Sequence, residues 1–141
     1  IFASNLSEVE HGWVENILTA IGQTVWVAQE SQIDAITAIS GSGPAYVFYM
    51  MEHLTQAALD LGFDAATAKQ LVQATFAGAV QLAGESTESI ATLRERVTSK
   101  GGTTAAALAS FAEHGLNSAI HAGVAACKAR AEELAQELSA G

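Results

Sequence analysis

The chain has 141 residues and a formal net charge of -9, because 15 acidic residues outnumber 6 basic ones. Such an acidic surface repels polyanions, so nucleic-acid binding is not expected. A membrane-spanning helix needs a run of about 18 apolar residues without charges, and the sequence contains no such run, so no membrane span is predicted. Hydrophobic residues, with alanine in excess, make up 50% of the chain and only 1 proline interrupts it, so the composition favours one all-α domain.

The first 30 residues contain the pattern of a helix followed by a strand. Ser7 and Glu10 form a capping-box pattern, which predicts a helix that stops at Gly22. Residues 23–28 (QTVWVA) are β-branched and aromatic, which predicts a β-strand. A single strand needs neighbours for its backbone groups. The sequence also begins without Met. We therefore expect residues 1–30 to be the last α–β unit of a sheet in a longer protein.

The rest of the chain carries only helical patterns. Residues 30–34 are expected to form a linker. Pro44 fits the first turn of a helix, and Gly62 is expected to end that helix. Asp64 and Asn117 are expected to be the N-caps of two further helices. The predicted helices cover residues 44–61, 65–84, 89–97, 105–114 and 117 onward. Many small residues between Ala65 and Ala79 allow another helix to approach closely, which predicts contact with a second subunit.

The strongest candidate site is the loop Thr98–Thr104 (TSKGGTT). It places hydroxyl side chains and two glycines where a helix begins. The first amides of a helix bind anions, and glycine allows a ligand to approach the backbone. Arg94, Arg96 and Lys100 lie within seven positions of one another, which favours a small anion such as a carboxylate. An ordinary helix cap and turn is the alternative that these residues leave open.

Ser40-Gly41-Ser42-Gly43 is a second candidate, either as a plain helix start or as one whose amides face a site. It begins like a dinucleotide fingerprint, but Tyr46 occupies the place of the third glycine. The histidines are scattered without ligand spacing, so no metal site is expected. The single cysteine, Cys127, cannot form an internal disulfide, which suits the cytoplasm.

Two segments in this order resemble the pyrroline-5-carboxylate reductase family. The first is Asp34–Tyr46 (DAITAISGSGPAY), and the second is Leu93-x3-Val97-Thr98-Ser99-x-Gly101-Gly102-x-Thr104-x2-Ala107-Leu108-x2-Phe111. The similarity runs from about Glu8 to Ala131, and two motifs together are far more specific than either alone. Lys100 is a departure, since many members of the family have proline there.

The resemblance implies a helical dimerisation domain over residues 31–141, preceded in residues 1–30 by the end of a Rossmann domain. It implies an enzyme of proline biosynthesis that reduces 1-pyrroline-5-carboxylate to L-proline with hydride from NADPH or NADH. The N-terminal Rossmann domain would bind most of the cofactor, so this chain alone is expected to be inactive. The resemblance further implies a homodimer, and a decamer as a further assembly.

The same resemblance assigns site residues by position. The substrate carboxylate would be held by Ser99, Gly101, Gly102, Thr103 and Thr104. Thr37 would border the substrate, and the nicotinamide side would be bordered by Ser40, Gly41 and Ser42. Thr104 would in addition contact the ring nitrogen and act as the catalytic proton donor or relay.

Two other interpretations remain open from the sequence. The chain could be a purely structural dimerisation domain whose loop is an ordinary turn. It could also belong to another Rossmann-type dehydrogenase with a helical C-terminal domain, such as a hydroxyacid dehydrogenase. Those enzymes use a catalytic lysine, and Lys69 and Lys100 are badly placed for that role.

Overall fold

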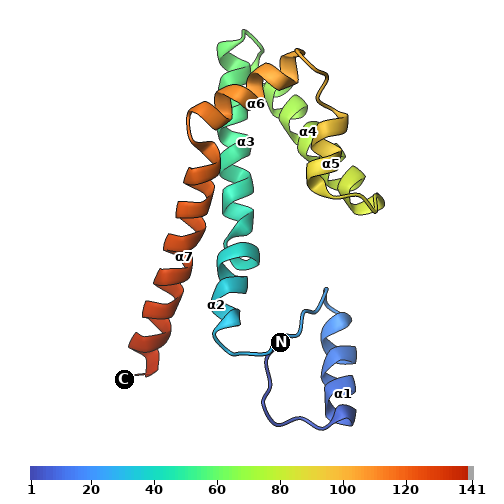
Figure 1. Ribbon diagram of the computed structural model, residues 1–141, viewed down its shortest axis with the longest axis vertical. Helices are drawn as coiled ribbons and strands as arrows, with labels where there is room; N and C mark the ends of the chain where they lie inside the picture. Colours follow the sequence, from blue (N-terminus) through green and yellow to red (C-terminus); the bar gives the residue numbers. More distant parts are fainter. Residues whose placement is uncertain (140–141) are drawn as a thin grey trace. The chain divides into compact units, whose positions relative to one another are not determined.

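The computed structural model describes residues 1–139 and contains two compact units (Figure 1). Unit 1 comprises Ile1–Gly43 and Val124–Gly141, and unit 2 comprises Pro44–Gly123. The last two residues of the predicted helical domain, Ala140 and Gly141, lie outside the described residues.

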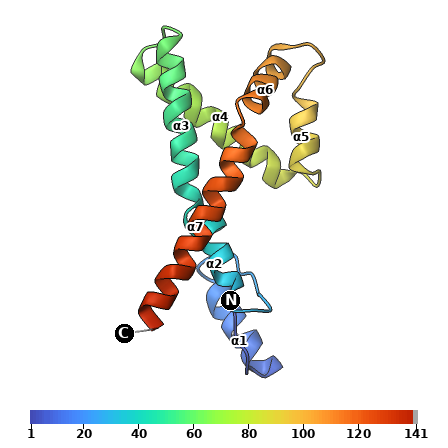
Figure 2. The same cartoon turned by 60° about the vertical axis from the view of Figure 1, so that its left-hand side comes forward.

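Every regular element of residues 1–139 is a helix, which confirms the predicted all-α class. The elements are α1 (Glu8–Thr19), α2 (Gln32–Ile36), the π-helix η1 (Thr37–Gly41), α3 (Gly43–Asp60), α4 (Ala65–Glu85), α5 (Ile90–Arg96), α6 (Thr103–Glu113) and α7 (Leu116–Ser139). In unit 2, α3 and α4 run away from a shared turn, and α5 leads through a loop into α6 (Figures 1 and 2). None of these helices is both long and apolar enough to cross a membrane.

Three of the helices start with a side-chain cap, and two of these caps, at Ser7 and Asp64, were predicted from the sequence. Ser7 and Glu10 form the reciprocal capping box of α1. The Asp64 carboxylate accepts the amides of Ala66 and Thr67 at the start of α4, and Ser89 accepts the amide of Thr92 at the start of α5. Gly62, with φ of 95°, follows the end of α3 in a conformation that a residue with a Cβ rarely adopts.

The predicted strand over residues 23–28 is wrong for the described part of the chain. The segment has no regular secondary structure, and its backbone hydrogen bonds of the kind that pair strands go to Ile1. The Val27 amide donates to the Ile1 carbonyl at 2.9 Å, and the Ile1 amino group donates to the Val25 carbonyl. β-propensity sets the local conformation here, whereas a sheet also needs neighbouring strands.

Three other boundaries also differ from the prediction. α2 begins at Gln32, inside the expected linker of residues 30–34, and η1 contains Ser40 and Gly41, where a helix start was expected. α6 begins at Thr103, two residues before the predicted start. α7 begins at Leu116, so Asn117 lies inside the helix and is not its cap, although its side chain accepts the Ser118 amide.

The described helices bury few apolar side chains among themselves. Only Ala38, Ala68 and Val72 are buried hydrophobic residues in residues 1–139, while Trp13 is 63% exposed. The exposed surface is 10755 Å², whereas a folded monomer of 14.6 kDa exposes roughly 6,900 Å². The apolar helix faces therefore need further protein surface to cover them.

We expect Asp64 to make the stability of α4 depend on pH. The backbone N–H of Thr67 and then its hydroxyl donate to the Asp64 carboxylate, which holds the pKa of that group below its ordinary value. A carboxyl with a lowered folded-state pKa stabilises the fold above its unfolded value of about 3.9, and this contribution is lost as the pH falls through the folded pKa. Asp64→Asn keeps a capping oxygen but cannot titrate.

Chemical denaturation followed by circular dichroism between pH 6 and pH 3 should therefore show a shallower acid loss for Asp64→Asn than for the unmodified chain. Asp60→Asn, at the end of the preceding helix, serves as the matched charge-removal control. Equal acid slopes for the unmodified chain and Asp64→Asn would contradict the role of the cap.

Candidate functional site

The residues predicted to form the site fall into two groups, each within one unit. Ser99, Gly101, Gly102, Thr103 and Thr104 lie in unit 2, between the end of α5 and the first turn of α6. Thr37, Ser40, Gly41 and Ser42 lie in unit 1, in and just after η1. The structure thus brings each group together locally.

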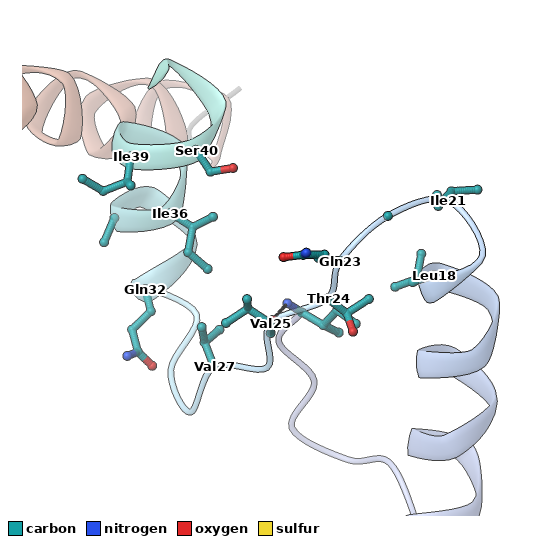
Figure 3. Close-up of a pocket in the computed structure, with 13 residues that line it drawn as sticks. Leu18, Ile21, Gln23, Thr24, Val25, Val27, Gln32, Ile36, Ile39 and Ser40 are labelled. Atoms are coloured by element: carbon teal, nitrogen blue, oxygen red, sulfur yellow. Dashed lines mark hydrogen bonds between the residues drawn. The ribbon is translucent and has the colours of Figure 1, made fainter. Parts of the chain in front are cut away.

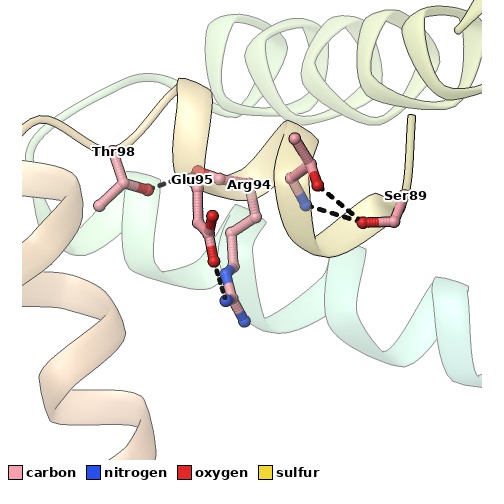
Figure 4. Close-up of polar contacts among 5 residues, drawn as sticks. Ser89, Arg94, Glu95 and Thr98 are labelled. Carbon is pink, nitrogen blue, oxygen red and sulfur yellow. Dashed lines mark hydrogen bonds and ion pairs between the residues drawn. The ribbon is translucent and has the colours of Figure 1, made fainter.

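The loop after α5 begins with a hydroxyl that is already in use. The Thr98 Oγ1 donates to the carbonyl oxygen of Arg94 at 2.6 Å, and the Thr98 amide donates to the carbonyl of Glu95 at 3.0 Å (Figure 4). These bonds satisfy carbonyls at the C-terminus of α5. Thr98 therefore ends a helix, and its hydroxyl proton is not available to a ligand.

A tight turn at residues 99–102 connects α5 to α6. The Gly102 amide donates to the Ser99 carbonyl at 3.0 Å, and Gly101 has φ of 71°. A Cβ on Gly102 would lie 2.3 Å from the Ser99 Oγ and 3.2 Å from the Ser99 carbonyl oxygen. Gly101 is therefore favoured by its backbone conformation, and a Cβ on Gly102 would force the Ser99 hydroxyl to shift.

The N-terminus of α6 has no side-chain cap. Gly102 is the N-cap residue, and the amides of Thr103, Thr104 and Ala105 have no acceptor among the described residues. Thr103 is itself the first residue of α6, so it does not cap the helix. Uncapped amides at the positive end of a helix dipole are suited to binding an anion.

Hydroxyl groups surround these amides. The side chains of Ser99, Thr103 and Thr104 belong to exposed residues and have no hydrogen-bond partner among residues 1–139. Together with the α6 amides they supply donors for the oxygens of a carboxylate, and a hydroxyl can also pass on a proton. The arrangement can bind a small anion without any metal, and the described residues contain no His, Cys, Asp and Glu group that could hold one.

The basic residues near the loop are not equivalent. Arg94 lies 3.8 Å from Glu95, and Arg96 forms an ion pair of 2.6 Å with Glu88 (Figure 4 shows the first of these pairs). Lys100 is exposed and forms no ion pair within the described part of the chain. The predicted cationic cluster is thus reduced to one uncompensated charge, located in the turn itself.

The second group of predicted residues lies on a π-helix that the sequence did not predict. The Ser42 amide donates to the Thr37 carbonyl at 2.9 Å across five residues, and the Thr37 Oγ1 donates to the Ile33 carbonyl at 3.0 Å. The Cys127 Sγ donates to the Ser42 Oγ at 3.2 Å, which ties α7 to the end of η1. An i to i+5 bond has no residue signature, so no sequence signal could have revealed it.

Ser40 lies at the edge of an open apolar groove in unit 1 (Figure 3). The groove has a volume of about 760 Å³ and is formed by the end of α1, the extended segment that follows it, α2 and η1. Ile36 and Ile39 line it from the helical side, and Val25 lines it from the extended segment. Of the four predicted residues of this unit, only Ser40 contributes to the lining.

Comparison with known families and sequences gives a consistent result. Residues 30–134 match the family described as pyrroline-5-carboxylate reductase dimerisation. The pyrroline-5-carboxylate reductase of Haemophilus influenzae is 44% identical over 131 residues, which cover 92% of this chain and 48% of that protein. The enzyme of Pseudomonas aeruginosa is 44% identical over 86% of this chain and 45% of its own length. The chain thus spans about half the length of these curated relatives.

Solved structures agree. A pyrroline-5-carboxylate reductase from Coxiella burnetii superposes with a TM-score of 0.89 and 40% identity, over 94% of this chain and 50% of the other. The pyrroline carboxylate reductase of Plasmodium falciparum, solved with NADP bound, gives a TM-score of 0.81 at 28% identity, over 93% of this chain and 50% of the other.

The contact between Gly102 and Ser99 can be tested through stability. Gly102→Ala is expected to destabilise the chain by about 1 kcal/mol, since the added Cβ meets the Ser99 hydroxyl and the turn must shift. In a Ser99→Ala background the Oγ is absent, so Gly102→Ala should cost clearly less. The measurement is the free energy of unfolding of both single variants and the double variant.

Gly101→Ala is the control, because its cost of roughly 1–2 kcal/mol arises from the positive φ and not from Ser99. That cost should be the same in both backgrounds. A Gly102→Ala cost that does not change when Ser99 loses its hydroxyl would show that the close approach does not constrain the turn.

Proposed function

The chain belongs to the pyrroline-5-carboxylate reductase family, and we propose that in the whole protein it forms the substrate-binding, helical part of a reductase that converts 1-pyrroline-5-carboxylate to L-proline. The observation that carries this proposal is the start of α6, where three amides without acceptors and neighbouring hydroxyls face solvent. The substrate carries a carboxylate, which is the kind of anion that such a helix start binds.

We assign carboxylate binding to the α6 amides and to the Ser99 and Thr103 hydroxyls. Gly101 and Gly102 allow these donors to converge, because no side chain stands between the turn and a ligand. A carboxylate can accept hydrogen bonds from several donors at once, and charged acceptors form the stronger bonds.

A nicotinamide cofactor supplies hydride to the carbon of the C=N bond when it is bound. The NADP in the Plasmodium falciparum relative supports NADPH or NADH as that cofactor. In this chain, we assign contact with the edge of the nicotinamide ring to Ser40, Gly41 and Ser42. Ser40 and Gly41 are exposed, and Gly41 has no side chain to obstruct a flat ring. A further, nucleotide-binding domain would hold the rest of the cofactor. Thr37 would border the substrate, and because its hydroxyl donates its proton to the Ile33 carbonyl, its oxygen would act as an acceptor.

The ring nitrogen must hold a proton by the end of the reaction, and we assign its delivery to Thr104. Thr104 is the second residue of α6 and its hydroxyl has no partner among the described residues. It can therefore donate to the nitrogen while the amides beside it hold the carboxylate. A threonine hydroxyl is a weak acid, so it serves as a relay from water. We also propose a cytoplasmic location, which suits a chain with a single cysteine.

Thr104→Ala in the full-length protein tests this assignment. The variant removes the hydroxyl but keeps the backbone amides, so kcat should fall more than the KM for the substrate changes. A positioned proton-transfer group contributes typically 10²- to 10⁴-fold, and a threonine that relays through water should give about 10²-fold or less. The measurement is steady-state oxidation of NADPH and NADH with 1-pyrroline-5-carboxylate.

Thr103→Ala is the matched control on the neighbouring residue. Neither threonine caps α6, so neither variant should lower the melting temperature, and Thr103→Ala should change the KM more than kcat. A purely structural domain predicts normal activity in both variants. Unchanged kcat in Thr104→Ala would therefore reject the relay, and a full-length protein without reductase activity would reject the proposed function itself.

We further propose that two copies of the chain associate as a homodimer and that dimers can assemble into a decamer. α4 has small side chains such as Ala74 and Ala77 between exposed larger ones such as Val80, which is 70% exposed. An interface of well above about 2,000 Å² in total is expected for a permanent dimer of this kind.

Analytical ultracentrifugation of the full-length protein should show no monomer at micromolar concentration. The exposed apolar surface of the helices makes a folded monomer unfavourable. A single monomeric species that remains folded at this concentration would contradict the proposed dimer.

A further inference from the structure

We propose that Lys100 is the residue that attracts the substrate carboxylate to the turn at residues 99–102 and strengthens its binding there. This inference rests on the proposed function, and it adds a residue whose charge selects an anionic substrate. The one-residue spacing from Gly101 places Lys100 in the turn that leads into α6.

The distribution of ion pairs singles out Lys100. Of the 6 basic residues, Arg94, Arg96, Lys128 and Arg130 each have an acidic partner within 4 Å. Within the described residues, only Lys69 and Lys100 lack one. Lys69 lies on α4, away in sequence from the loop, so Lys100 is the uncompensated cation of the candidate site.

The local charge differs in sign from that of the whole chain. Residues 86–104 hold three cations, Arg94, Arg96 and Lys100, against two carboxylates, Glu88 and Glu95, which leaves a local charge of +1. The chain as a whole has a charge of -9. An anionic substrate is repelled by most of this surface, so a local positive charge at the binding turn raises the concentration of substrate there.

The chemistry of lysine suits this task. Its ammonium is a strongly hydrated point charge on a flexible stem of four carbons, so it can follow a ligand without fixing its orientation. The α6 amides and the hydroxyl groups supply the orientation. Because Lys100 is exposed, its attraction to a carboxylate is screened by salt and is comparable to that of a surface ion pair.

Lys100→Gln in the full-length protein tests the proposal. At an ionic strength of about 10 mM, the KM for 1-pyrroline-5-carboxylate should rise about two- to fivefold, and Lys100→Glu should raise it further. Neither kcat nor the KM for the cofactor should change by as much. In about 1 M salt, where the Debye length is near 3 Å, the difference between the variant and the unmodified enzyme should disappear.

Lys69→Gln is the matched control, since Lys69 is also an exposed lysine of unit 2 without an ion pair. It should leave all three kinetic parameters unchanged. An equal effect of Lys69→Gln would overturn the proposal, because it would show a general effect of net charge. An increase confined to the KM of the cofactor would also overturn it, since Lys100 would then act on the nucleotide phosphates.

Product inhibition identifies the group that Lys100 contacts. L-Proline carries the carboxylate and L-prolinamide lacks it, so Lys100→Gln should weaken inhibition by L-proline at low salt and leave inhibition by L-prolinamide unchanged. Equal weakening of both would reject a contact with the carboxylate. Normal kinetics in Lys100→Gln with an active unmodified enzyme would reject the inference alone, whereas an inactive unmodified enzyme would reject the proposed function.

Discussion

The closeness of Ser99 to Gly102 is the constraint on which the candidate site depends. A Cβ on Gly102 would lie 2.3 Å from the Ser99 Oγ, so a side chain there would displace this hydroxyl. This approach, together with the left-handed Gly101, turns the chain in the short loop between the end of α5 at Arg96 and the start of α6 at Thr103. Without it, the Ser99 hydroxyl and the first amides of α6 would not be held in one short turn.

The helices differ in how their first amides are satisfied. α1, α4 and α5 each use a side chain to satisfy early amides, and such caps are typically worth about 1 kcal/mol. α6 gives up that contribution, because a glycine occupies its N-cap position. In the proposed function, the substrate carboxylate would supply the missing acceptor, so α6 would gain the stabilisation of a cap only when substrate is bound.

The sequence predicts features with a local cause and misses those that depend on distant residues. The caps at Ser7 and Asp64 and the helix end at Gly62 follow from side-chain hydrogen bonds and from φ, so they could be predicted. The strand at residues 23–28 was wrong because pairing needs other strands. The π-helix was missed because its bonds join backbone groups that any residue offers.

The candidate site shows the same division. The glycines and hydroxyls of the loop were apparent from residue type, but the sequence suggested three equivalent cations there. Glu88 lies eight positions before Arg96 and neutralises it, which only the structure shows. The role of charge in substrate selection therefore passes to Lys100, the one position where the loop departs from the proline that the family pattern favours. A lysine at this position adds a charge beside the glycines and hydroxyls of the loop without replacing any of them, so it can tune substrate binding while the groups proposed to contact the substrate are kept.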